Sequence, residues 1–478
     1  MYKYLFFDDD RLLKRQNVKR KYGTPQLQTD AIYTDGVTTT PWPGPWVFKL
    51  DDGSYRMLYQ GLGEGSEKEL YCARSKDGVH FQPENVSALT KNKLDLSHAI
   101  MVIPNFDEVG YIVEDKINNP NERYKMLYVV VDLENYTIRN RLLVSPDLIV
   151  WKELPDISWG AKGEPLIGVF YNEKKGCFTL IIRPNWMKRM VGIVETKDWR
   201  TFTQFELCLR ADSIDGALDE IYGMPSYSYE GRFIGMPHVY SGFPQALNTK
   251  CTGGSVKIQL SYSWDGHHWQ RSLRDPFISG VLPDSTAKAG FEAPVIFACN
   301  MIQGNDGSHL IYAHASSLEH GPCFHANSKD LIGKTYIYRL RKDGFIRLVT
   351  ENNLKESLVA TRENLWNGED LHINLKTKKA TLAVYCVDNS YKINTDGICK
   401  VVDGMDHDDC IPFTGDTTDW IPKFKTAKTL ANLKGQCLTF EIKFSDGELY
   451  SISGDMIPLF SVEGDHYRRF GILPDTIY

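Results

Sequence analysis

The sequence predicts an all-β protein, with a five-bladed β-propeller over residues 31–349 and an antiparallel β-sandwich over residues 350–478. Three observations predict this class. A turn motif recurs at intervals of about 50–70 residues, a spacing typical of propellers and solenoids. A run of aromatic and β-branched residues that suits a strand precedes each copy. No segment has a sustained helical period with caps, so we expect little helix.

The recurring motif is Ser/Thr-x-Asp with an aromatic residue four positions after the Asp. In such a turn the hydroxyl and carboxylate bond to backbone groups, and a following glycine supplies a positive φ. We therefore expect each copy to form the tight outer turn of one blade, with a structural Asp. A weaker copy spans residues 341–345. The clear copies are Ser75/Asp77 with Phe81, Ser145/Asp147 with Trp151, Thr196/Asp198 with Phe202, and Ser263/Asp265 with Trp269.

A strand-like run lies about 20–33 residues before the Asp of each unit, often after a turn pair such as Asp52-Gly53. Each unit is therefore an antiparallel meander, and five such units predict the five-bladed propeller. The runs are residues 55–59, 124–128, 178–182, 233–236 and 310–313.

The two ends of the chain differ from the repeats. Beyond residue 349, strand candidates at 379–385 and 438–444 alternate with polar turns, a pattern typical of a β-sandwich. Residues 1–30 are rich in charge, and we expect them to form an N-terminal extension.

Composition excludes several classes of function. The net charge of −6 comes without a basic stripe, which argues against nucleic acid or an anionic membrane as partner. No run of eighteen apolar residues exists, so we expect no membrane span. The ten cysteines are scattered and lack zinc spacing, so we expect free thiols in a reducing compartment. We predict no cofactor and no metal ligand, although a central metal ion stays open.

The same observations bear on location. The apolar core of residues 1–10 is too short for a secretory signal, which favours the cytoplasm. A trimmed signal would leave a secreted form open.

Several short sequence motifs resemble those of a known superfamily, namely residues 123–126, residues 261–266 with Trp269, and residues 340–345. With the meander pattern and the trailing sandwich, they make nearly the whole chain similar to the five-bladed propeller glycoside hydrolases. The similarity is greatest to an uncharacterised bacterial branch described as family-32-like or family-43-like. The resemblance implies a glycosidase that acts on an oligosaccharide, from a chain end. The sequence lacks the Trp-x-Asn-Asp-Pro-Asn-Gly motif of the invertase group, and it contains no Glu-Cys acid motif.

Glycoside hydrolysis needs one protonated and one ionised carboxyl group. Because the innermost strand of each blade lines the funnel, we searched for acids about 10–20 residues before each middle strand. The candidates are Asp35, Glu164, Glu220 and Glu292. We assign Glu220 as acid, Asp35 or Glu164 as base or nucleophile, and Glu292 to substrate orientation. For Glu114 and Asp115 of the second unit, a solvated loop is the favoured interpretation.

Other side chains are candidates for substrate binding. Arg183 ends an apolar strand run and could pair with a carboxylate, and His238 could bind sugar hydroxyls. Trp42 and Trp46 flank a proline-rich turn and could stack on a sugar face.

Three rival functions stay open at this point. A glycoside phosphorylase would need a cluster such as Arg183, Arg189 and His238 around the acids. A non-catalytic sugar-binding propeller would leave an acid idle, and a scaffold for protein partners would need no funnel carboxylates. The sugar, its linkage, the stereochemical course and the oligomeric state are not determined by the sequence.

Overall fold

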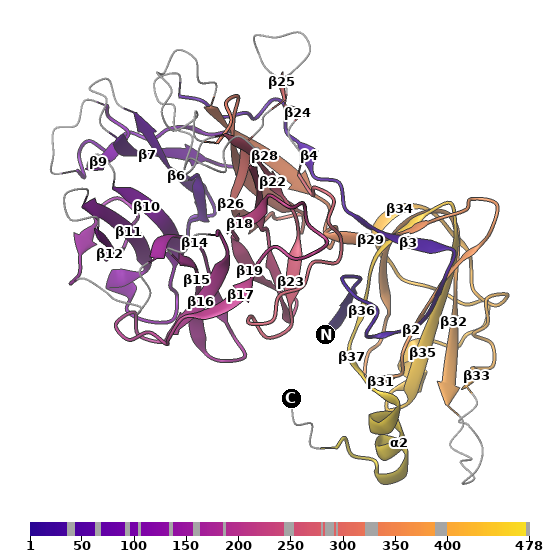
Figure 1. Ribbon diagram of the computed structural model, residues 1–478. Coiled ribbons are helices and arrows are strands. Elements are labelled where there is room, and N and C mark those ends of the chain that lie inside the picture. Colours follow the sequence, from indigo (N-terminus) through magenta and orange to yellow (C-terminus); the bar gives the residue numbers. More distant parts are fainter. Residues whose placement is uncertain are drawn as a thin grey trace. The chain divides into compact units, whose positions relative to one another are not determined.

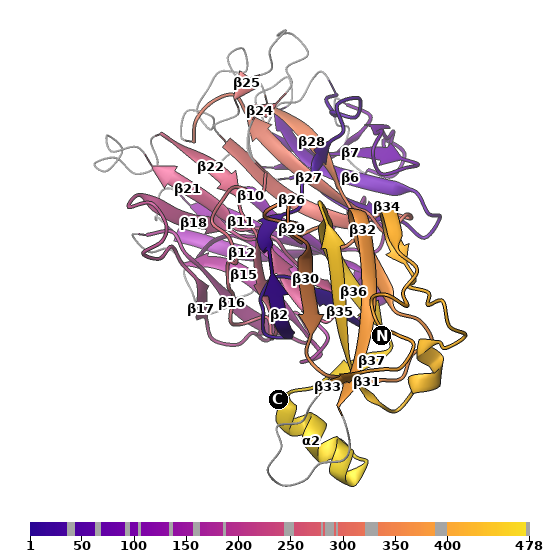
Figure 2. The same cartoon turned by 90° about the vertical axis from the view of Figure 1, so that its right-hand side faces the viewer.

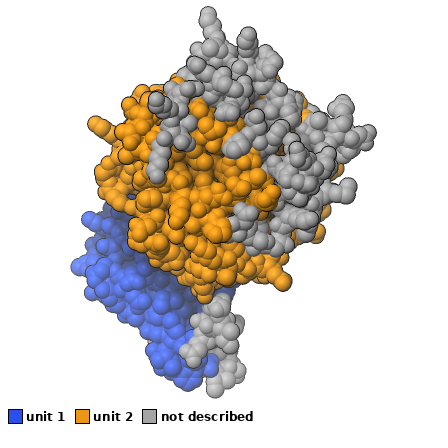
Figure 3. Space-filling view, turned by 90° about the vertical axis from the view of Figure 1, so that its left-hand side faces the viewer, with its two compact units in different colours: residues 1–24, 342–478 blue, residues 25–341 orange. Residues whose placement is uncertain are grey.

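The structure is a computed structural model that describes residues 1–35, 44–62, 68–90, 96–103, 107–132, 137–155, 163–184, 188–242, 253–278, 281–282, 291–292, 295–320, 333–387 and 399–474 (Figure 1). It divides into two compact units, residues 25–341 and residues 1–24 with 342–478, which Figure 3 colours separately. Most described residues lie in strands.

The first three sheets of the larger unit are successive antiparallel meanders. A further strand, β9 (Ala99–Ile103), pairs with β7. The first meander is β5 (Trp46–Lys49), β6 (Tyr55–Leu62), β7 (Lys68–Ser75) and β8 (Gln82–Pro83). The second is β10 (Glu108–Glu114), β11 (Tyr124–Asp132), β12 (Thr137–Ser145) and β13 (Lys152–Glu153). The third is β14 (Gly163–Asn172), β15 (Cys177–Pro184), β16 (Val191–Thr196) and β17 (Glu206–Leu209).

The fourth meander is broken in the middle of each strand. Pro225 and Pro237 stand at the first two breaks, because proline has no N–H to donate to a ladder. At these breaks the neighbouring strands stay hydrogen-bonded to each other, from Met236 N to Pro225 O (2.8 Å) and from Gln259 N to Pro237 O (3.0 Å). The half-strands are β18 (Asp219–Gly223) with β19 (Ser226–Tyr229), β20 (Arg232–Gly235) with β21 (His238–Gly242), and β22 (Gly254–Ile258) with β23 (Ser261–Ser263).

The fifth meander takes its outermost strand from the start of the unit. It consists of β26 (Val295–Gln303), β27 (His309–Ser316), β28 (Gly333–Leu340) and β4 (Gln26–Leu27). A bridge between Tyr33 and Thr335 extends this pairing. A separate short pair is formed by β24 (Val281–Leu282) and β25 (Phe291–Glu292).

The innermost strands of the five meanders follow one another around the unit (Figures 1 and 2). β26 contacts β5, β5 contacts β10, β10 contacts β14, and β14 contacts β18. The ring closes through β22, the third strand of the fourth meander, which pairs with β26. The described strands of this unit thus have the propeller arrangement that the sequence predicts. The middle strands are the most buried: every residue of β15 and of β27 is buried.

The Ser/Thr-x-Asp motifs form the expected turns. Oδ1 of Asp77 accepts hydrogen bonds from the backbone of Val79 and His80, both 2.8 Å, and from the Ser75 hydroxyl, 2.8 Å. The turns at Asp147, Asp198 and Asp265 bond in the same way. The residue after each Asp has a positive φ, at Gly78, Leu148, Trp199 and Gly266. A structural role for these Asp residues is confirmed.

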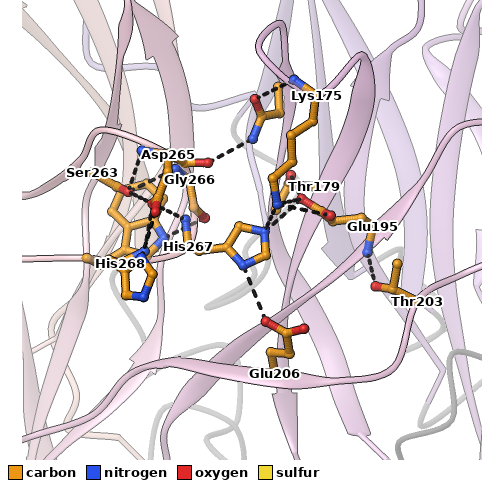
Figure 4. Close-up of polar contacts among 12 residues, drawn as sticks. Lys175, Thr179, Glu195, Thr203, Glu206, Ser263, Asp265, Gly266, His267 and His268 are labelled. Carbon is orange, nitrogen blue, oxygen red and sulfur yellow. Dashed lines mark hydrogen bonds and ion pairs between the residues drawn. The ribbon is translucent and has the colours of Figure 1, made fainter. Parts of the chain in front are cut away.

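The fourth of these turns also fastens its blade to the third (Figure 4). The His267 ring lies between two carboxylates, with Nε2 2.9 Å from Glu195 Oε1 and Nδ1 3.3 Å from Glu206 Oε2. Lys175 contacts His267 and lies 3.0 Å from Glu195. The polar residues beside this turn therefore join neighbouring blades.

The weaker copy at residues 341–345 is different. Asp343 has a positive φ of 56° and lies in the smaller unit. Its buried carboxylate is 2.9 Å from Lys3 Nζ and accepts a hydrogen bond of 2.7 Å from Ser451. This copy is therefore a packing site of the smaller unit and not the turn of a blade.

The smaller unit is a β-sandwich that includes the chain start. β1 (Tyr2–Leu5), β2 (Leu12–Gln16) and β3 (Val18–Tyr22) pair with β36 (Glu448–Gly454), β30 (Ser357–Thr361) and β29 (Ile346–Thr350). The expected boundaries at residues 30 and 350 therefore differ from those observed, because residues 1–24 add strands to this sheet instead of standing apart. The other strands are β31 (Asn364–Trp366), β32 (His372–Val387), β33 (Cys399–Val401), β34 (Phe413–Trp420), β35 (Cys437–Ser445) and β37 (Met456–Pro458).

One helix, α2 (Ser461–Phe470), follows β37. It begins where the Glu463 side chain accepts a hydrogen bond from Phe460 N, and it ends at Gly471 in the left-handed conformation. Within the described part of the chain, no helix has the length and apolar character needed to cross a membrane.

Candidate functional site

Acids stand at the start of three neighbouring innermost strands. Glu108 is the first residue of β10, Glu164 the second of β14, and Glu220 the second of β18. Because every blade repeats the same meander, its innermost strand runs in the same direction as its neighbours, so these starts meet at one end of the ring. Glu292 lies in β25, just ahead of β26. The side chains of Glu164 and Glu292 lie outside the described residues, as does all of Trp42.

Two arginines and two tyrosines pack together beside these strand starts. We call Arg183, Arg189, Tyr222, Tyr240 and His320 the arginine–tyrosine cluster. The Arg183 guanidinium lies 4.4 Å from the centre of the Tyr222 ring, and that of Arg189 lies 4.7 Å from the Tyr240 ring. The His320 ring centre is 5.0 Å from both tyrosine rings. The cluster brings together side chains from the third, fourth and fifth blades.

The cluster concentrates positive charge. Arg183 is only 7% exposed, and Arg189 is partly buried. Burial lowers the pKa of His320 to about 3, and the charges of Arg189 and Arg183 add to the effect. The imidazole is therefore neutral near pH 7, and the two guanidinium groups carry the charge.

Glu108 is the acid that the sequence analysis missed. Burial raises the pKa of its half-buried carboxyl group, while the charges of Lys68 and Arg183 oppose that rise. A carboxyl group that keeps its proton at a higher pH is suited to act as a general acid. Glu108 lies about 10–20 residues ahead of the strand at residues 124–128, the spacing at which the sequence predicts funnel acids. Glu114 and Asp115 lie between Glu108 and that strand. The spacing of acids ahead of the middle strands could therefore have identified Glu108.

Glu220 is paired with one of the cluster arginines. Its Oε2 lies 2.8 Å from Arg189 Nη1, and both side chains are partly buried. The ion pair holds the Glu220 carboxylate in place beside the cluster. Arg189 in turn lies 5.4 Å from the Tyr222 ring centre, while Glu108 acts on Tyr222 and Arg183 electrostatically. The two acids thus flank the same arginine–tyrosine cluster.

Asp35 lies in a second, adjoining group of polar side chains. Its carboxylate is 1% exposed and accepts a hydrogen bond of 2.9 Å from the Tyr59 hydroxyl. His98 Nε2 lies 3.5 Å away, and the Tyr33 and Tyr59 hydroxyls are 3.1 Å apart. Asp35 is therefore a buried, hydrogen-bonded carboxylate.

Two expected substrate contacts have structural roles. His238 is fully buried, and burial lowers its pKa to about 3; its Nε2 lies 2.8 Å from Ala298 O and ties β21 to β26. Trp46 is fully buried in the core between the first two blades, so no ring face is open to a sugar. Both residues are large or aromatic groups at strand positions that tertiary packing encloses.

Asp115 is buried and not part of a solvated loop. Its carboxylate accepts hydrogen bonds from Ile117 N (2.9 Å), Asn118 N (3.0 Å) and Trp199 Nε1 (2.8 Å), and Lys125 Nζ lies 3.2 Å away. It therefore joins the second blade to the turn of the third. The neighbouring Glu114 is partly exposed and pairs with Arg123 at 2.6 Å.

No group of three or more His, Cys, Asp or Glu side chains suited to a metal ion occurs among the residues that the structure describes.

No protein-family model matches the sequence, and no curated protein matches it. The comparison with solved structures finds matches at low identity. An N-acetylgalactosamine deacetylase from F. plautii, in complex with blood group B trisaccharide, is 14% identical over 68% of this chain and 96% of its own, with a TM-score of 0.43. The GH32 β-fructofuranosidase of Bombyx mori is 12% identical over 88% of this chain and 94% of its own, with a TM-score of 0.42.

A third structure belongs to the GH130 family of mannoside phosphorylases, described as containing glycoside hydrolases that target β-1,2 mannosidic linkages in Candida mannan. It is 14% identical over 66% of this chain and 94% of its own, with a TM-score of 0.39. At these identities and TM-scores, function has to be inferred from the residues of this chain itself.

Proposed function

We propose that this protein is a glycosidase that cleaves an oligosaccharide from a chain end, with Glu108 and Glu220 as its carboxyl pair. The observation that carries the proposal is the difference between their surroundings. Glu108 has a raised pKa, whereas Glu220 is held by Arg189. Two carboxyl groups that differ in this way beside one cluster supply the protonated and the ionised partner that glycoside hydrolysis needs.

Glu108 is the proposed general acid, which protonates the leaving oxygen. Glu220 is the proposed base or nucleophile, because Arg189 holds its carboxylate beside the same cluster that Glu108 faces. This proposal differs from the sequence-based expectation that Glu220 is the acid. Glu164, expected as base or nucleophile, and Glu292, expected to orient the substrate, are proposed as substrate contacts on the basis of their places at β14 and ahead of β26.

The second candidate is a glycoside phosphorylase. The arginine–tyrosine cluster favours it, since two guanidinium groups flank the acid pair and guanidinium binds phosphate well. The cluster differs from the one imagined from sequence, because His320 takes the place of His238.

A release assay distinguishes these functions. The full chain is incubated with a panel of aryl glycosides and of plant and host oligosaccharides, with and without phosphate, and free sugar and sugar phosphate are separated by chromatography. We expect free sugar without phosphate. Sugar phosphate formed only when phosphate is present would establish the phosphorylase. Sugar binding without release by any route would instead favour a non-catalytic sugar-binding propeller.

A further inference from the structure

A small polar cavity lies where the first and fifth blades meet. Its walls come from the chain before β5, from β6, and from β27 and β28. The cavity volume is about 30 Å³, which is enough for one water molecule or one hydroxyl group. Its lining includes the polar residues Tyr33, Asp35, Tyr59, Gln60, His314 and Lys334, together with two threonines.

His314 is the unusual member of this lining. It lies on β27 opposite Phe297 of β26 and Thr335 of β28, and its side chain is 7% exposed. Its Nε2 is buried and makes no hydrogen bond to any residue that the structure describes. Buried polar atoms are nearly always paired, so an orphaned one in a cavity wall marks a place that a ligand or water completes.

The protonation state of His314 limits what that ligand can be. Burial lowers the pKa of its imidazole to about 3, so the ring is neutral near pH 7. The neutral ring has one N–H donor and one acceptor nitrogen. It therefore matches a group that both donates and accepts, as a hydroxyl does.

Asp35 supplies a fixed acceptor in the same lining. Its carboxylate is already ordered by the Tyr59 hydroxyl at 2.9 Å and by His98 at 3.5 Å. A buried carboxylate beside a neutral imidazole disfavours an anionic guest, and Lys334 disfavours a cationic one. The charge balance thus favours a neutral hydroxyl group.

One residue of the cavity lining is bonded to the strand that carries the proposed acid. Gln60, which lines the cavity, accepts a hydrogen bond of 3.4 Å at Oε1 from the backbone N–H of Val109. Val109 follows Glu108 on β10. A sugar ring held at the acid could therefore place one of its hydroxyl groups in the cavity.

We propose that this cavity is a hydroxyl-binding subsite of the sugar site, in which His314 determines specificity and Asp35 positions the bound group. The inference rests on the proposed function for its ligand class, but it concerns binding and not bond cleavage. A site built to hydrogen-bond a hydroxyl group rejects the analogue that lacks it, because its own polar atoms are then left unpaired.

The test is calorimetric binding by the full chain. Methyl glycosides of the common monosaccharides are titrated first, and then the monodeoxy analogues of the tightest ligand. For the wild-type protein, we expect one deoxy position to weaken binding by about tenfold or more. In the His314→Leu variant the parent sugar and that analogue should bind alike. Thermal melting and the His314→Gln variant, which keeps a donor and an acceptor, control for misfolding.

Three results would overturn the inference. The deoxy penalty could persist undiminished in a folded His314→Leu variant, every deoxy analogue could bind as tightly as its parent, or no sugar could bind at all. Binding with the expected penalty but without any turnover would support the subsite and count against the glycosidase. Turnover without a deoxy penalty that depends on His314 would support the glycosidase and count against the subsite. The two proposals can therefore fail separately.

Discussion

The guanidinium carbon of Arg183 lies 4.4 Å from the centre of the Tyr222 ring. Arg183 is the second-to-last residue of β15 in the third blade, and Tyr222 lies on β18 of the fourth. A cation above an aromatic face is attracted by the ring quadrupole, and the attraction grows when both groups are shielded from water. This pair therefore holds a positive charge at the seam between two blades, beside the proposed acid and base.

Replacing Glu108 by Gln should remove the proton donor while keeping the shape of the side chain. We expect kcat on a substrate with a poor leaving group to fall by about 10²–10⁴-fold. An aryl glycoside with a very good leaving group needs little protonation and should lose much less. Steady-state kinetics on the two substrates checks this. The control is Glu114→Gln on the same strand, and an equal loss for both substrates would remove Glu108 from the acid role.

The charge of Lys68 should set the alkaline limit of activity. Lys68 lowers the pKa of Glu108, against the rise that burial causes. A general acid is active below its pKa, so activity is lost as pH rises through that value. The Lys68→Met variant should raise the pKa of Glu108 and move the alkaline limb of the kcat/KM profile to higher pH. The exposed Lys116 provides the control, as Lys116→Met. An unchanged alkaline limb in Lys68→Met would contradict the prediction.

Arg183 distinguishes the two candidate chemistries. If the cluster serves phosphorolysis, Arg183→Met should raise the KM for phosphate at least about tenfold, because a charge-assisted contact is lost. If the protein is a hydrolase, the same variant should leave the reaction independent of phosphate and should change mainly the KM for sugar. Kinetics with phosphate as the varied component separates the cases. Arg141→Met, at a partly buried arginine of the second blade that pairs with Glu153, serves as control.

Asp115 should be essential for stability and not for chemistry. Its side chain and that of Lys125 are 0% and 1% exposed, so Asp115→Ala would leave a buried, unpaired lysine. We expect a loss of about 3–5 kcal/mol in the free energy of unfolding, measured with urea. Adding Lys125→Met should recover part of this loss. The exposed Asp51, as Asp51→Ala, should have little effect.

The pH dependence of that stability follows from the same carboxylate. Burial opposes the ionisation of Asp115, but hydrogen bonds from Asn118 and Ile117 and the charge of Lys125 outweigh it, so its pKa lies below the ordinary value. Its contribution is therefore full above the unfolded pKa of about 4 and is lost as pH falls below it. Urea curves between pH 7 and pH 3 should converge for the wild type and Asp115→Ala. Parallel curves over this range would show that Asp115 does not carry the effect.

The sequence by itself determined what depends on neighbours in the chain. The turn at Asp77 forms because its carboxylate reaches the backbone of the next residues, and the middle strands form because their side chains are apolar enough to be buried. Such interactions recur with each copy, so the repeat and the all-β propeller could be predicted. The offset of acids ahead of the middle strands also brings Glu220 and Glu108 into view as candidates, and both stay proposals.

Only the tertiary structure decided what depends on residues far apart in the chain. The pairing of residues 2–22 with the sandwich, the enclosure of Trp46 and His238, and the burial of Asp115 under Trp199 each join distant segments. The proposed role of Glu108 as acid rests on such contacts too. A carboxyl group's pKa is set by burial and by nearby charges, and the charges that act on Glu108 come from Lys68 and Arg183, which lie on other strands.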